Sequence, residues 1–241
     1  MTPLADTEIQ RILVVTAHPD DLDFGAAGTI AGWTAAGIAV SYCIATYGDA
    51  GGFDPAVPRS EIPRIREAEQ RAAGAAVGVD DITFLGHPDG RVEVTQDLRR
   101  DISRQIRRVR PQRVVTQSPL RNWDRIGASH PDHMHTGEAA LCAVYPDARN
   151  PYAHPELLLG EQLEAWSVSE VWLQGGPNNS HYVDITDTFD RKLAALLEHK
   201  SQTAHMDDLE GLLRTWTSAN ALAAGLPGGR LAEAYQIVKT A

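Results

Sequence analysis

The chain has 241 residues, and its 22 Lys and Arg against 32 Asp and Glu give a formal net charge of −10. This negative charge argues against nucleic acid or an anionic membrane surface as the main partner, because such partners are bound by basic surfaces. Hydrophobic residues make up 43% and charged residues 22% of the sequence, which is too apolar for a disordered chain.

The two cysteines, Cys43 and Cys142, lie in apolar segments and are interpreted as buried thiols rather than as a disulfide or a metal site. The first 10 residues contain neither a basic nor an apolar region, so no signal peptide is predicted. No apolar run approaches the roughly 20 residues needed to cross a bilayer, so no membrane insertion is expected. These features predict a cytoplasmic protein.

Short β-rich runs alternate with longer helical patterns in the first half of the chain. The sequence predicts strands over residues 11–17, 38–46, 82–85 and 113–117. It predicts helices over residues 25–36, 62–77 and 98–109, and a tight turn of the hairpin kind at Asp89-Gly90. Strands that alternate with helices are typical of an α/β protein with a mostly parallel sheet and helices on both faces.

The second half of the chain is less regular. A helix is predicted from residue 131 to residue 145, followed by a long surface loop over residues 146–160. Strands are predicted over residues 169–173 and 181–185, and helices over residues 186–199, 209–224 and 231–239. No change of composition marks a boundary, so residues 1–241 are predicted to form a single domain.

Two clusters of potential metal ligands follow predicted strands. AHPDD at residues 17–21 comes directly after the first strand, and SHPDHMH at residues 129–135 follows the fourth strand and its loop. In an open parallel sheet, ligands bind beyond the carboxyl ends of the strands, so both clusters stand where a site is expected. Each cluster alone is typical of a turn that caps a helix, but two in one α/β domain favour a shared metal site.

The spacing within the clusters allows one cation to be shared. His18 and Asp21 lie three residues apart in a turn fixed by a proline. His130 and His133 are also three apart at a predicted helix start, which places both imidazoles on one helix face. Catalytic zinc sites often use two His and a carboxylate and leave a position open for water. A cation held by His18, Asp21 and one of the later imidazoles leaves Asp20 free to act as a base.

Other enzyme chemistries find little support in the sequence. It contains no Gly-x-Ser-x-Gly motif, no Walker loop and no glycine fingerprint of dinucleotide binding. A glycosidase needs two carboxylates roughly 5 to 9.5 Å apart across a sugar, and the adjacent Asp20 and Asp21 fit that arrangement poorly.

The motifs AHPDD at residues 17–21 and HPDH at residues 130–133 resemble those of the LmbE-like, or PIG-L, family of zinc-dependent deacetylases. That family includes de-N-acetylases of glucosaminyl-phosphatidylinositol, mycothiol and bacillithiol biosynthesis, and diacetylchitobiose deacetylase. Weaker similarities lie in residues 25–33, 65–79, 84–90 and 192–202. The resemblance implies a Rossmann-like α/β fold, Zn²⁺ as the cofactor and an N-acetylated sugar as the small-molecule substrate.

The resemblance also implies roles for the residues of the two motifs. His18, Asp21 and His133 would be the zinc ligands, and Asp20 would be the general base for the zinc-bound water. His130 would stabilise the oxyanion or protonate the leaving amine.

The chain departs from the family pattern directly after the first motif. Many members have Glu after the two aspartates, whereas this chain continues with Leu22 and Asp23. Neither residue is an assigned ligand, so zinc binding is little affected. The sequence leaves open which residues hydrogen-bond to the ligands and hold them in place at this point.

Five residues are candidates for substrate binding, each with a plainer alternative. Arg66 matches the family's arginine in its helix, and a solvated helix face is the alternative. Tyr47 and Asp49 follow the second strand and Asp89 sits at the tight turn, where ordinary turn residues are the alternative. Asn122 lies in the loop before HPDH, a candidate lid. The tryptophans at 123, 166, 172 and 216 are interpreted as packing residues rather than as sugar platforms.

The sequence therefore predicts a zinc-dependent hydrolase that removes an N-acetyl group from a GlcNAc-containing small molecule. Two alternatives stay open at this point. One is an amidase that acts on a larger acyl group or on a thiol conjugate, and the other is a non-catalytic protein that binds metal or sugar. Ring-shaped or dimeric assemblies occur among proteins that resemble this chain, which favours a homo-oligomer.

Overall fold

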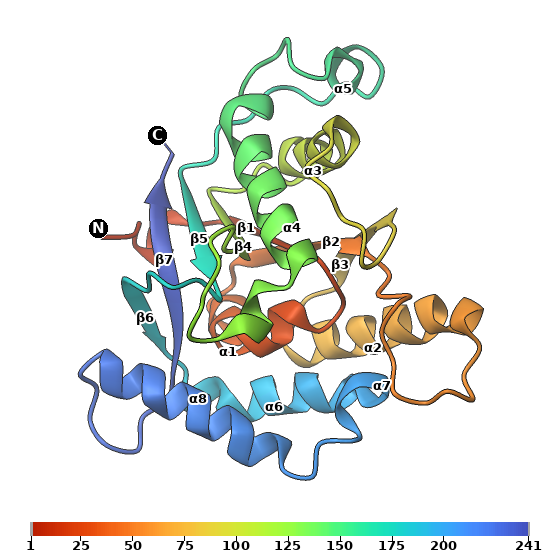
Figure 1. The fold of residues 1–241 in the computed structure, drawn as a ribbon. Helices are drawn as coiled ribbons and strands as arrows, with labels where there is room; N and C mark the ends of the chain where they lie inside the picture. Colours follow the sequence, from red (N-terminus) through yellow and green to blue (C-terminus); the bar gives the residue numbers. More distant parts are fainter. Residues whose placement is uncertain (1, 241) are drawn as a thin grey trace.

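A seven-stranded sheet forms the centre of the computed structural model, which describes residues 2–240 as one α/β domain (Figure 1). Five strands run parallel in the order β3-β2-β1-β4-β5, and β7 and then β6 complete the sheet. Strand β7 is antiparallel to both of its neighbours. The strands are β1 (Arg11–Thr16), β2 (Ala39–Thr46), β3 (Asp81–His87), β4 (Arg113–Gln117), β5 (Glu170–Gln174), β6 (His181–Asp184) and β7 (Ala232–Lys239).

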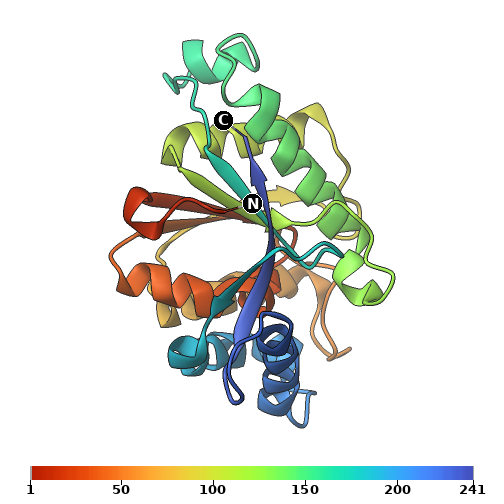
Figure 2. The ribbon, with the colours of Figure 1, turned by 90° about the vertical axis from the view of Figure 1, so that its left-hand side faces the viewer.

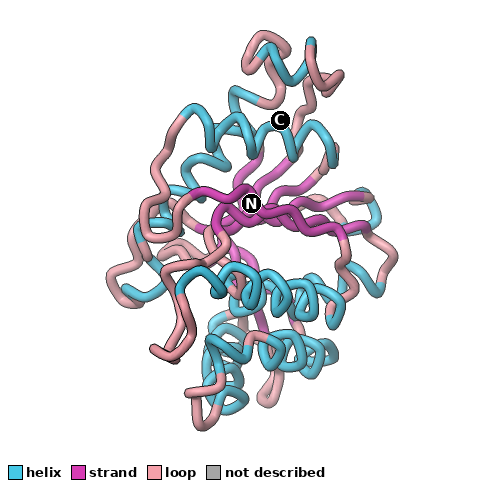
Figure 3. The backbone as a smooth tube through the Cα atoms, turned by 90° about the vertical axis from the view of Figure 1, so that its right-hand side faces the viewer, coloured by secondary structure: helices cyan, strands magenta, loops and turns pink. Residues whose placement is uncertain are grey.

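Helices lie on both faces of the sheet, so the strands form the middle layer (Figures 2 and 3). One face carries α1 (Asp21–Ala35) and α2 (Ile62–Ala76), with α6 (Phe189–Glu198) packed against both of them. The other face carries α3 (Gln96–Val109) and α4 (Pro131–Cys142). The remaining helices are α5 (Pro155–Leu159), α7 (Lys200–Thr203) and α8 (Leu209–Ala223). None of the helices within residues 2–240 combines the length and the apolar character that crossing a lipid bilayer requires.

Alternate residues of the central strands point into two apolar cores, one on each face of the sheet. In β1, Ile12 and Val14 pack with α1 and α2, whereas Leu13 and Val15 pack with α3 and α4. Because both faces of β1 are covered, the strand reads as a continuous apolar run in the sequence.

A third, smaller cluster holds α8 against α6. It contains Phe189 and Leu196 of α6 and Leu209 and Leu213 of α8, and Trp216 packs at its edge. This cluster places α8 beside β7 and β6, the last two strands of the sheet.

The order of strands reverses at β1. From β1 the chain moves outward through β2 to β3, and it then returns to the other side of β1 as β4 and β5. The crossover helices α1 and α2 lie on one face and α3 lies on the other. The loops that follow β1 and β4 therefore run to opposite faces of the sheet. The crevice between them is where ligands bind in such sheets.

Most predicted elements are present, with ends shifted by a few residues. All six predicted strands are confirmed, as are the predicted helices up to residue 224. The helix predicted over residues 131–145 ends at Cys142 and is followed by a π turn, Ala143–Asp147. The loop predicted over residues 146–160 contains the short helix α5. The Asp89-Gly90 turn is present, with Gly90 at φ 77°, but it leads toward α3 instead of into a hairpin strand.

The helix predicted over residues 231–239 is wrong, because this segment forms strand β7. Its Ala, Glu and Lys residues are good helix formers, which explains the prediction. In the structure Tyr235 and Ile237 point into one core and Val238 points toward the other, which is the period of a strand. Pairing with β5 and β6 outweighs local propensity here.

The two cysteines carry free thiols. Cys43 is buried in β2, as predicted, but Cys142 is only half-buried near the end of α4. The prediction of a second buried thiol is therefore wrong, because this end of α4 is partly open to solvent and the Cys142 thiol contacts the Glu138 carboxylate.

Candidate metal centre

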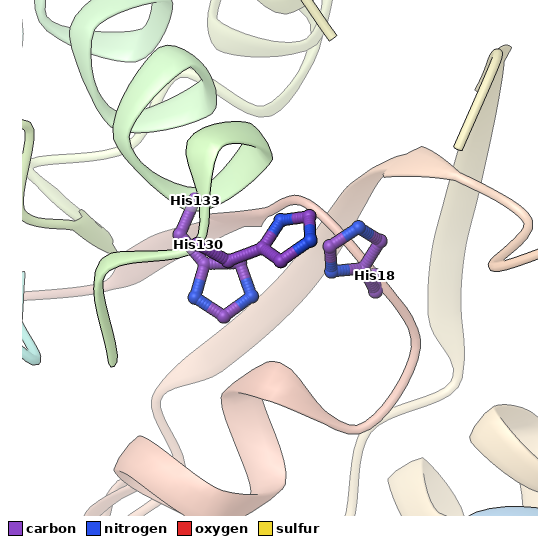
Figure 4. A group of neighbouring side chains, drawn as sticks. All are labelled: His18, His130 and His133. Atoms are coloured by element: carbon purple, nitrogen blue, oxygen red, sulfur yellow. The ribbon is translucent and has the colours of Figure 1, made fainter. Parts of the chain in front are cut away.

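Three loops meet at the point where the strand order reverses. The turn between β1 and α1 carries His18 and Asp20, with Asp21 as the first residue of α1. His130 directly precedes α4, and His133 lies in its first turn. The turn after β3 brings a further carboxylate to the same place. Figure 4 shows the imidazoles from the β1–α1 turn and from α4 gathered side by side.

The three imidazoles form a nearly equilateral group. The ring centroids of His18 lie 5.2 Å from those of both His130 and His133, and the latter two lie 5.3 Å apart. One nitrogen atom of each ring lies within 4.8 Å of the others, which is close enough for one ion to contact all three. The i, i+3 spacing in α4 and the turn after β1 therefore bring the two sequence motifs together, as the strand order requires.

Asp21 lies between two of these rings. Its Oδ2 is 3.4 Å from Nδ1 of His18, and its Oδ1 is 3.0 Å from Nε2 of His133. The His18 backbone N–H also donates to Oδ2 at 2.7 Å. Burial raises the pKa of Asp21, but the facing imidazoles of His133 and His18 bring it well below its usual value. Asp21 is thus held as a carboxylate between two nitrogen donors.

The far nitrogen of each of these two rings has its own acceptor. Nδ1 of His133 lies 3.3 Å from the carbonyl oxygen of Ala128. Nε2 of His18 lies 3.0 Å from Oδ1 of Asp89 and 3.2 Å from Oδ2 of Asp132. Metal-binding histidines commonly donate their second ring N–H to a carbonyl or a carboxylate, so this pattern suits imidazoles that face a cation with the other nitrogen.

Asp132 and Asp89 are themselves fixed by backbone N–H groups. Asp132 accepts from Gly90 at 2.7 Å and from Val92 at 3.3 Å, and Asp89 accepts from Ala50 at 2.8 Å. With His18 these two carboxylates form a second group that could hold a cation, on the Nε2 side of the ring. Two competing ligand sets therefore share His18.

The charge balance of the cluster depends on His18. Burial lowers its pKa, but Asp21, with hydrogen bonds to Asp132 and Asp89, raises the pKa to about 12. The imidazole thus takes up a proton because several carboxylates surround it. A divalent cation would supply the same positive charge.

Asp20 stands beside the cluster in a strained backbone conformation, with φ 85° and ψ −29°. Its carboxylate accepts from Arg66 Nη2 at 3.0 Å, and its backbone N–H donates to Oε1 of Gln70 at 2.8 Å. Arg66 and Gln70 are one helical turn apart on α2, so one face of that helix holds Asp20. Burial raises the pKa of Asp20 to about 6, although Arg66 opposes this shift. A left-handed aspartate held by two neighbours is the kind of strain found at functional sites.

Behind Asp20 runs a fully buried polar chain. Oδ2 of Asp23 accepts from Gln70 Nε2 and lies close to His199 Nε2, each at 2.8 Å. Leu22, by contrast, is packed in the core. Many family members have Glu directly after the two aspartates. In this chain, Asp23 and His199 instead provide the polar contacts behind Asp20.

His130 precedes α4 as its N-cap residue. Its Nδ1 accepts from the backbone N–H of Asp132 at 3.2 Å, so the ring as placed carries its proton on Nε2. Burial, together with the neighbouring His18 and His133, lowers the pKa of His130. His130 is therefore a neutral N–H donor at the edge of the cluster.

The five candidates for substrate binding are distributed around this cluster. Asp89 joins it, and Arg66 contacts it through Asp20 while also donating to two backbone carbonyls. Tyr47 stacks on Phe84 with ring centroids 5.1 Å apart, and Asp49 pairs with Arg59 at 3.0 Å. Asn122 lines a cavity that Asp21 and His133 also line. Their contacts with a substrate stay predictions.

Two polar residues of the site, Asp132 and Gln70, had no role in the sequence analysis, and the contact that His199 makes with Asp23 was not predicted. Asp132 stands inside the HPDH motif but is neither a predicted ligand nor a predicted base. Gln70 follows Arg66 by four residues, a spacing that could have pointed to it. His199 meets Asp23 across 176 positions, and no local signal in the sequence predicts that contact.

Comparison with known proteins shows which family the chain is similar to. The model of a family described as "PIG-L: GlcNAc-PI de-N-acetylase" matches residues 13–144. The chain is 30% identical to diacetylchitobiose deacetylase of Thermococcus kodakarensis over 96% of this chain and 84% of that protein. It is 34% identical to a Bacillus cereus protein named "Probable N-acetyl-alpha-D-glucosaminyl L-malate deacetylase 2", over 82% of this chain and 86% of that protein.

A solved structure shares the fold over nearly the whole chain. It is N,N′-diacetylchitobiose deacetylase from Pyrococcus horikoshii, in complex with an inhibitor. The TM-score is 0.88 at 27% sequence identity, and the match covers 97% of this chain and 85% of that chain.

Proposed function

The chain belongs to the PIG-L family, and from this premise we propose that it is a metal-dependent hydrolase that removes an N-acetyl group from a GlcNAc-containing small molecule. The observation that carries the proposal is the position of Asp21 between His18 and His133, with Asp20 beside it. The names of the relatives support acetylated amino sugars as the substrate class. Residues 1–241 would act as a single deacetylase domain.

The donor set of the cluster fits a divalent cation such as Zn²⁺. Imidazole nitrogens and a carboxylate oxygen are the usual ligands of catalytic zinc. We propose His18, His133 and Asp21 as the residues that hold it, because the far nitrogens of both rings already have acceptors. The chemistry that Zn²⁺ supplies in such a site is a lowered pKa for its water and a polarised substrate carbonyl.

Asp20 would move the protons, and His130 would stabilise the developing charge. Asp20 takes the proton of the attacking water, and Arg66 and Gln70 hold its carboxylate and backbone in place for this step. His130 donates a hydrogen bond from Nε2 to the carbonyl oxygen as negative charge develops there. The departing nitrogen receives the proton that Asp20 took from the water. Acetate and a primary amine are the products.

Metal analysis combined with an acetate-release assay tests the proposal. The panel contains GlcNAc, N,N′-diacetylchitobiose, and GlcNAc conjugates of malate and inositol. We expect bound zinc and acetate release, and we expect Asp20→Asn to keep the metal while kcat falls by about 10²- to 10⁴-fold. The exposed Asp54→Asn, which also removes one carboxylate, should leave both readouts unchanged.

The outcomes separate the competing functions. Near-normal kcat in metal-loaded Asp20→Asn would show that Asp20 is not the base. Release of a larger acyl group or of a thiol-bearing amine, without acetate, would indicate an amidase of different specificity. Sugar binding by zinc-loaded protein without any turnover would indicate a non-catalytic binding protein.

A further inference from the structure

The buried polar chain behind Asp20 connects this residue to the junction between α6 and α7. It consists of Gln70 on α2, Asp23 on α1 and His199, which directly follows α6. Figure 1 shows α7 at the end of α6, next to α2. All three residues of the chain are fully shielded from solvent. They cannot contact a substrate, so any effect that they have on a reaction must pass through Asp20.

The Gln70 carboxamide has one orientation in which both of its ends are satisfied. Its Oε1 accepts from the Asp20 backbone N–H at 2.8 Å, and its Nε2 donates to Asp23 Oδ2 at 2.8 Å. Turning the carboxamide over would place its NH₂ group against the N–H of Asp20 and its oxygen against the Asp23 carboxylate. Because a carboxylate only accepts hydrogen bonds, Asp23 selects the orientation in which Gln70 holds Asp20.

Asp23 in turn depends on His199. Oδ2 of Asp23 lies 2.8 Å from His199 Nε2, whereas its Oδ1 has no hydrogen-bond partner among residues 2–240. Burial lowers the pKa of His199, but the hydrogen bond to Asp23 and the nearby carboxylates of Asp20 and Glu69 raise it above its usual value. The raised pKa favours the charged imidazole, and hydrogen bonds from charged donors are the stronger ones. Loss of this donor would leave a buried carboxylate poorly satisfied.

The backbone holds the His199 imidazole in this position. The carbonyl oxygen of His199 accepts from the N–H groups of Gln202 and Thr203, each at 2.9 Å. Ser201 donates to the Glu69 carboxylate on α2 through its N–H at 2.7 Å and through its Oγ at 2.6 Å. The junction between α6 and α7 is therefore hydrogen-bonded within itself and to α2, so it can keep Asp23 in one place.

The backbone of Asp20 requires such support. It lies in the left-handed region at φ 85°, which a residue with a side chain adopts only where its surroundings hold it. Arg66 holds the Asp20 carboxylate, and the hydrogen bond to Gln70 holds the Asp20 backbone N–H. If the Gln70 carboxamide turned over or moved, the backbone of Asp20 would be free to relax, and its carboxylate would shift.

We propose that His199 is a positioning residue for the general base. Through Asp23 and Gln70, it holds the Asp20 backbone in the conformation that directs the Asp20 carboxylate toward the attacking water. The inference rests on the proposed function, in which Asp20 is that base. Loss of His199 should therefore slow the chemical step, while the binding of metal and of substrate stays unchanged.

Steady-state kinetics and metal analysis of the zinc-loaded full chain, with N,N′-diacetylchitobiose as the substrate, test the proposal. We expect His199→Leu to lower kcat by about 10- to 100-fold with KM and metal content unchanged, because a misplaced base affects only the chemical step. His199→Gln should recover most of the loss, since the amide nitrogen of glutamine can take the place of Nε2. The matched control is Ser201→Ala, which removes a hydrogen bond at the same junction and should keep the wild-type kcat.

Hydrogen exchange of the Asp20 backbone amide, followed by NMR, provides a readout that needs no turnover. Because this amide donates to Gln70, it should exchange about ten-fold faster in His199→Leu than in the wild type. His199→Gln and Ser201→Ala should exchange at the wild-type rate. Gln70→Met should reproduce both losses, and adding His199→Leu to it should change neither readout further, since His199 acts through Gln70.

A second variant guards against a folding defect in His199→Leu. His199→Asn stays polar, but its amide is too short to reach Asp23, so it should show the same losses. Wild-type kcat in both variants overturns the proposal. It is also overturned if His199→Gln does not reverse the fall in kcat, or if Ser201→Ala shares it, because a general loss of stability would then explain the result.

The two readouts distinguish failure of this inference from failure of the proposed function. Acetate release whose kcat does not depend on His199 contradicts the positioning role and leaves the deacetylase standing. Exchange at Asp20 that depends on His199, in protein that releases no acetate from any sugar of the panel, supports the polar chain and contradicts the deacetylase. Exchange that does not depend on His199 overturns the polar chain in either case.

Discussion

Buried carboxylates occur in this protein in two settings that differ in what neutralises them. In the first setting, each carboxylate meets a fixed cation. Glu170 accepts from Arg113 Nε at 2.8 Å and from Trp172 Nε1 at 2.9 Å, and Glu233 meets Lys192 at 2.6 Å. The pairs Glu170–Arg113 and Glu233–Lys192 join strands and helices outside the cluster around His18. Each carboxylate there has its own permanent counter-charge.

In the second setting, at the reversal of strand order, the counter-charge can be exchanged. Asp21, Asp89 and Asp132 surround His18, whose positive charge depends on a proton. A proton on an imidazole can be replaced by a metal ion, whereas a guanidinium cannot be replaced. A buried acidic cluster therefore points to a cation site when imidazoles, and not arginine or lysine, provide its partners.

The largest expected effect comes from removing the central carboxylate of the second setting. Asp21→Asn keeps the size of the side chain but takes away the charge between His18 and His133. We expect loss of bound metal and a fall in kcat/KM of about 10³-fold, which corresponds to several kcal/mol less stabilisation of the transition state. Metal analysis and acetate release on the same preparation would measure both.

Asp132→Asn is the matched comparison for that variant. If Asp132 only orients His18, its loss should weaken metal affinity by about 10- to 100-fold without abolishing binding. The reverse ranking, with metal kept in Asp21→Asn and lost in Asp132→Asn, would place the cation on the Nε2 side of His18 with Asp89 and Asp132.

A large effect on stability is expected in the first setting. Lys192 donates to Glu233 and to the backbone carbonyls of Asp23 and Phe24, while Glu233 accepts from two N–H groups of α1. Lys192→Met leaves Glu233 buried without a cation, so we expect the free energy of unfolding to fall by about 3–5 kcal/mol. Urea denaturation would measure the change.

The double variant Lys192→Met with Glu233→Gln serves as its control. Since it removes both charges, it should recover part of the lost stability. A Lys192→Met variant as stable as the wild type would mean that neither the ion pair nor the hydrogen bonds of Lys192 stabilise the fold.

The smallest effect is a pH dependence carried by Glu170. Burial raises the pKa of this group, but hydrogen bonds from Leu4 and Arg113 bring it below its ordinary value of 4.5. Because the pKa is lower in the folded state, the stabilisation is fully present above pH 4.5 and is lost as the pH falls through the folded pKa. The stability difference between wild type and Glu170→Gln should therefore shrink below pH 4.5. A difference that stays constant with pH would contradict this assignment.

The sequence predicted the parts of the fold in which the local residue pattern favours the same structure as tertiary packing does. The apolar run of β1 and the two His-Pro-Asp motifs placed His18, Asp21, His130 and His133 at one edge of a parallel sheet, where the structure has them. A strand order of this kind leaves few other positions for loops that follow β1 and β4.

Contacts that join distant segments could not be predicted in the same way. Residues 231–239 contain helix-forming residues and become a strand only because β5 and β6 each leave an edge open. The meeting of His199 with Asp23 depends on how α6 packs on α1, which no spacing in the sequence reveals. Trp216 faces a cavity for the same reason, since the position of α8 follows from tertiary packing.

The place of β7 between β5 and β6 has a consequence for synthesis on the ribosome. Residues 232–239 are made after both of the strands that they join, so the edges of β5 and β6 that pair with β7 stay unpaired until β7 has emerged. Such edges are prone to pair with other chains. Glu233 arrives with the same strand, and Lys192 therefore also waits for its counter-ion until β7 has been made.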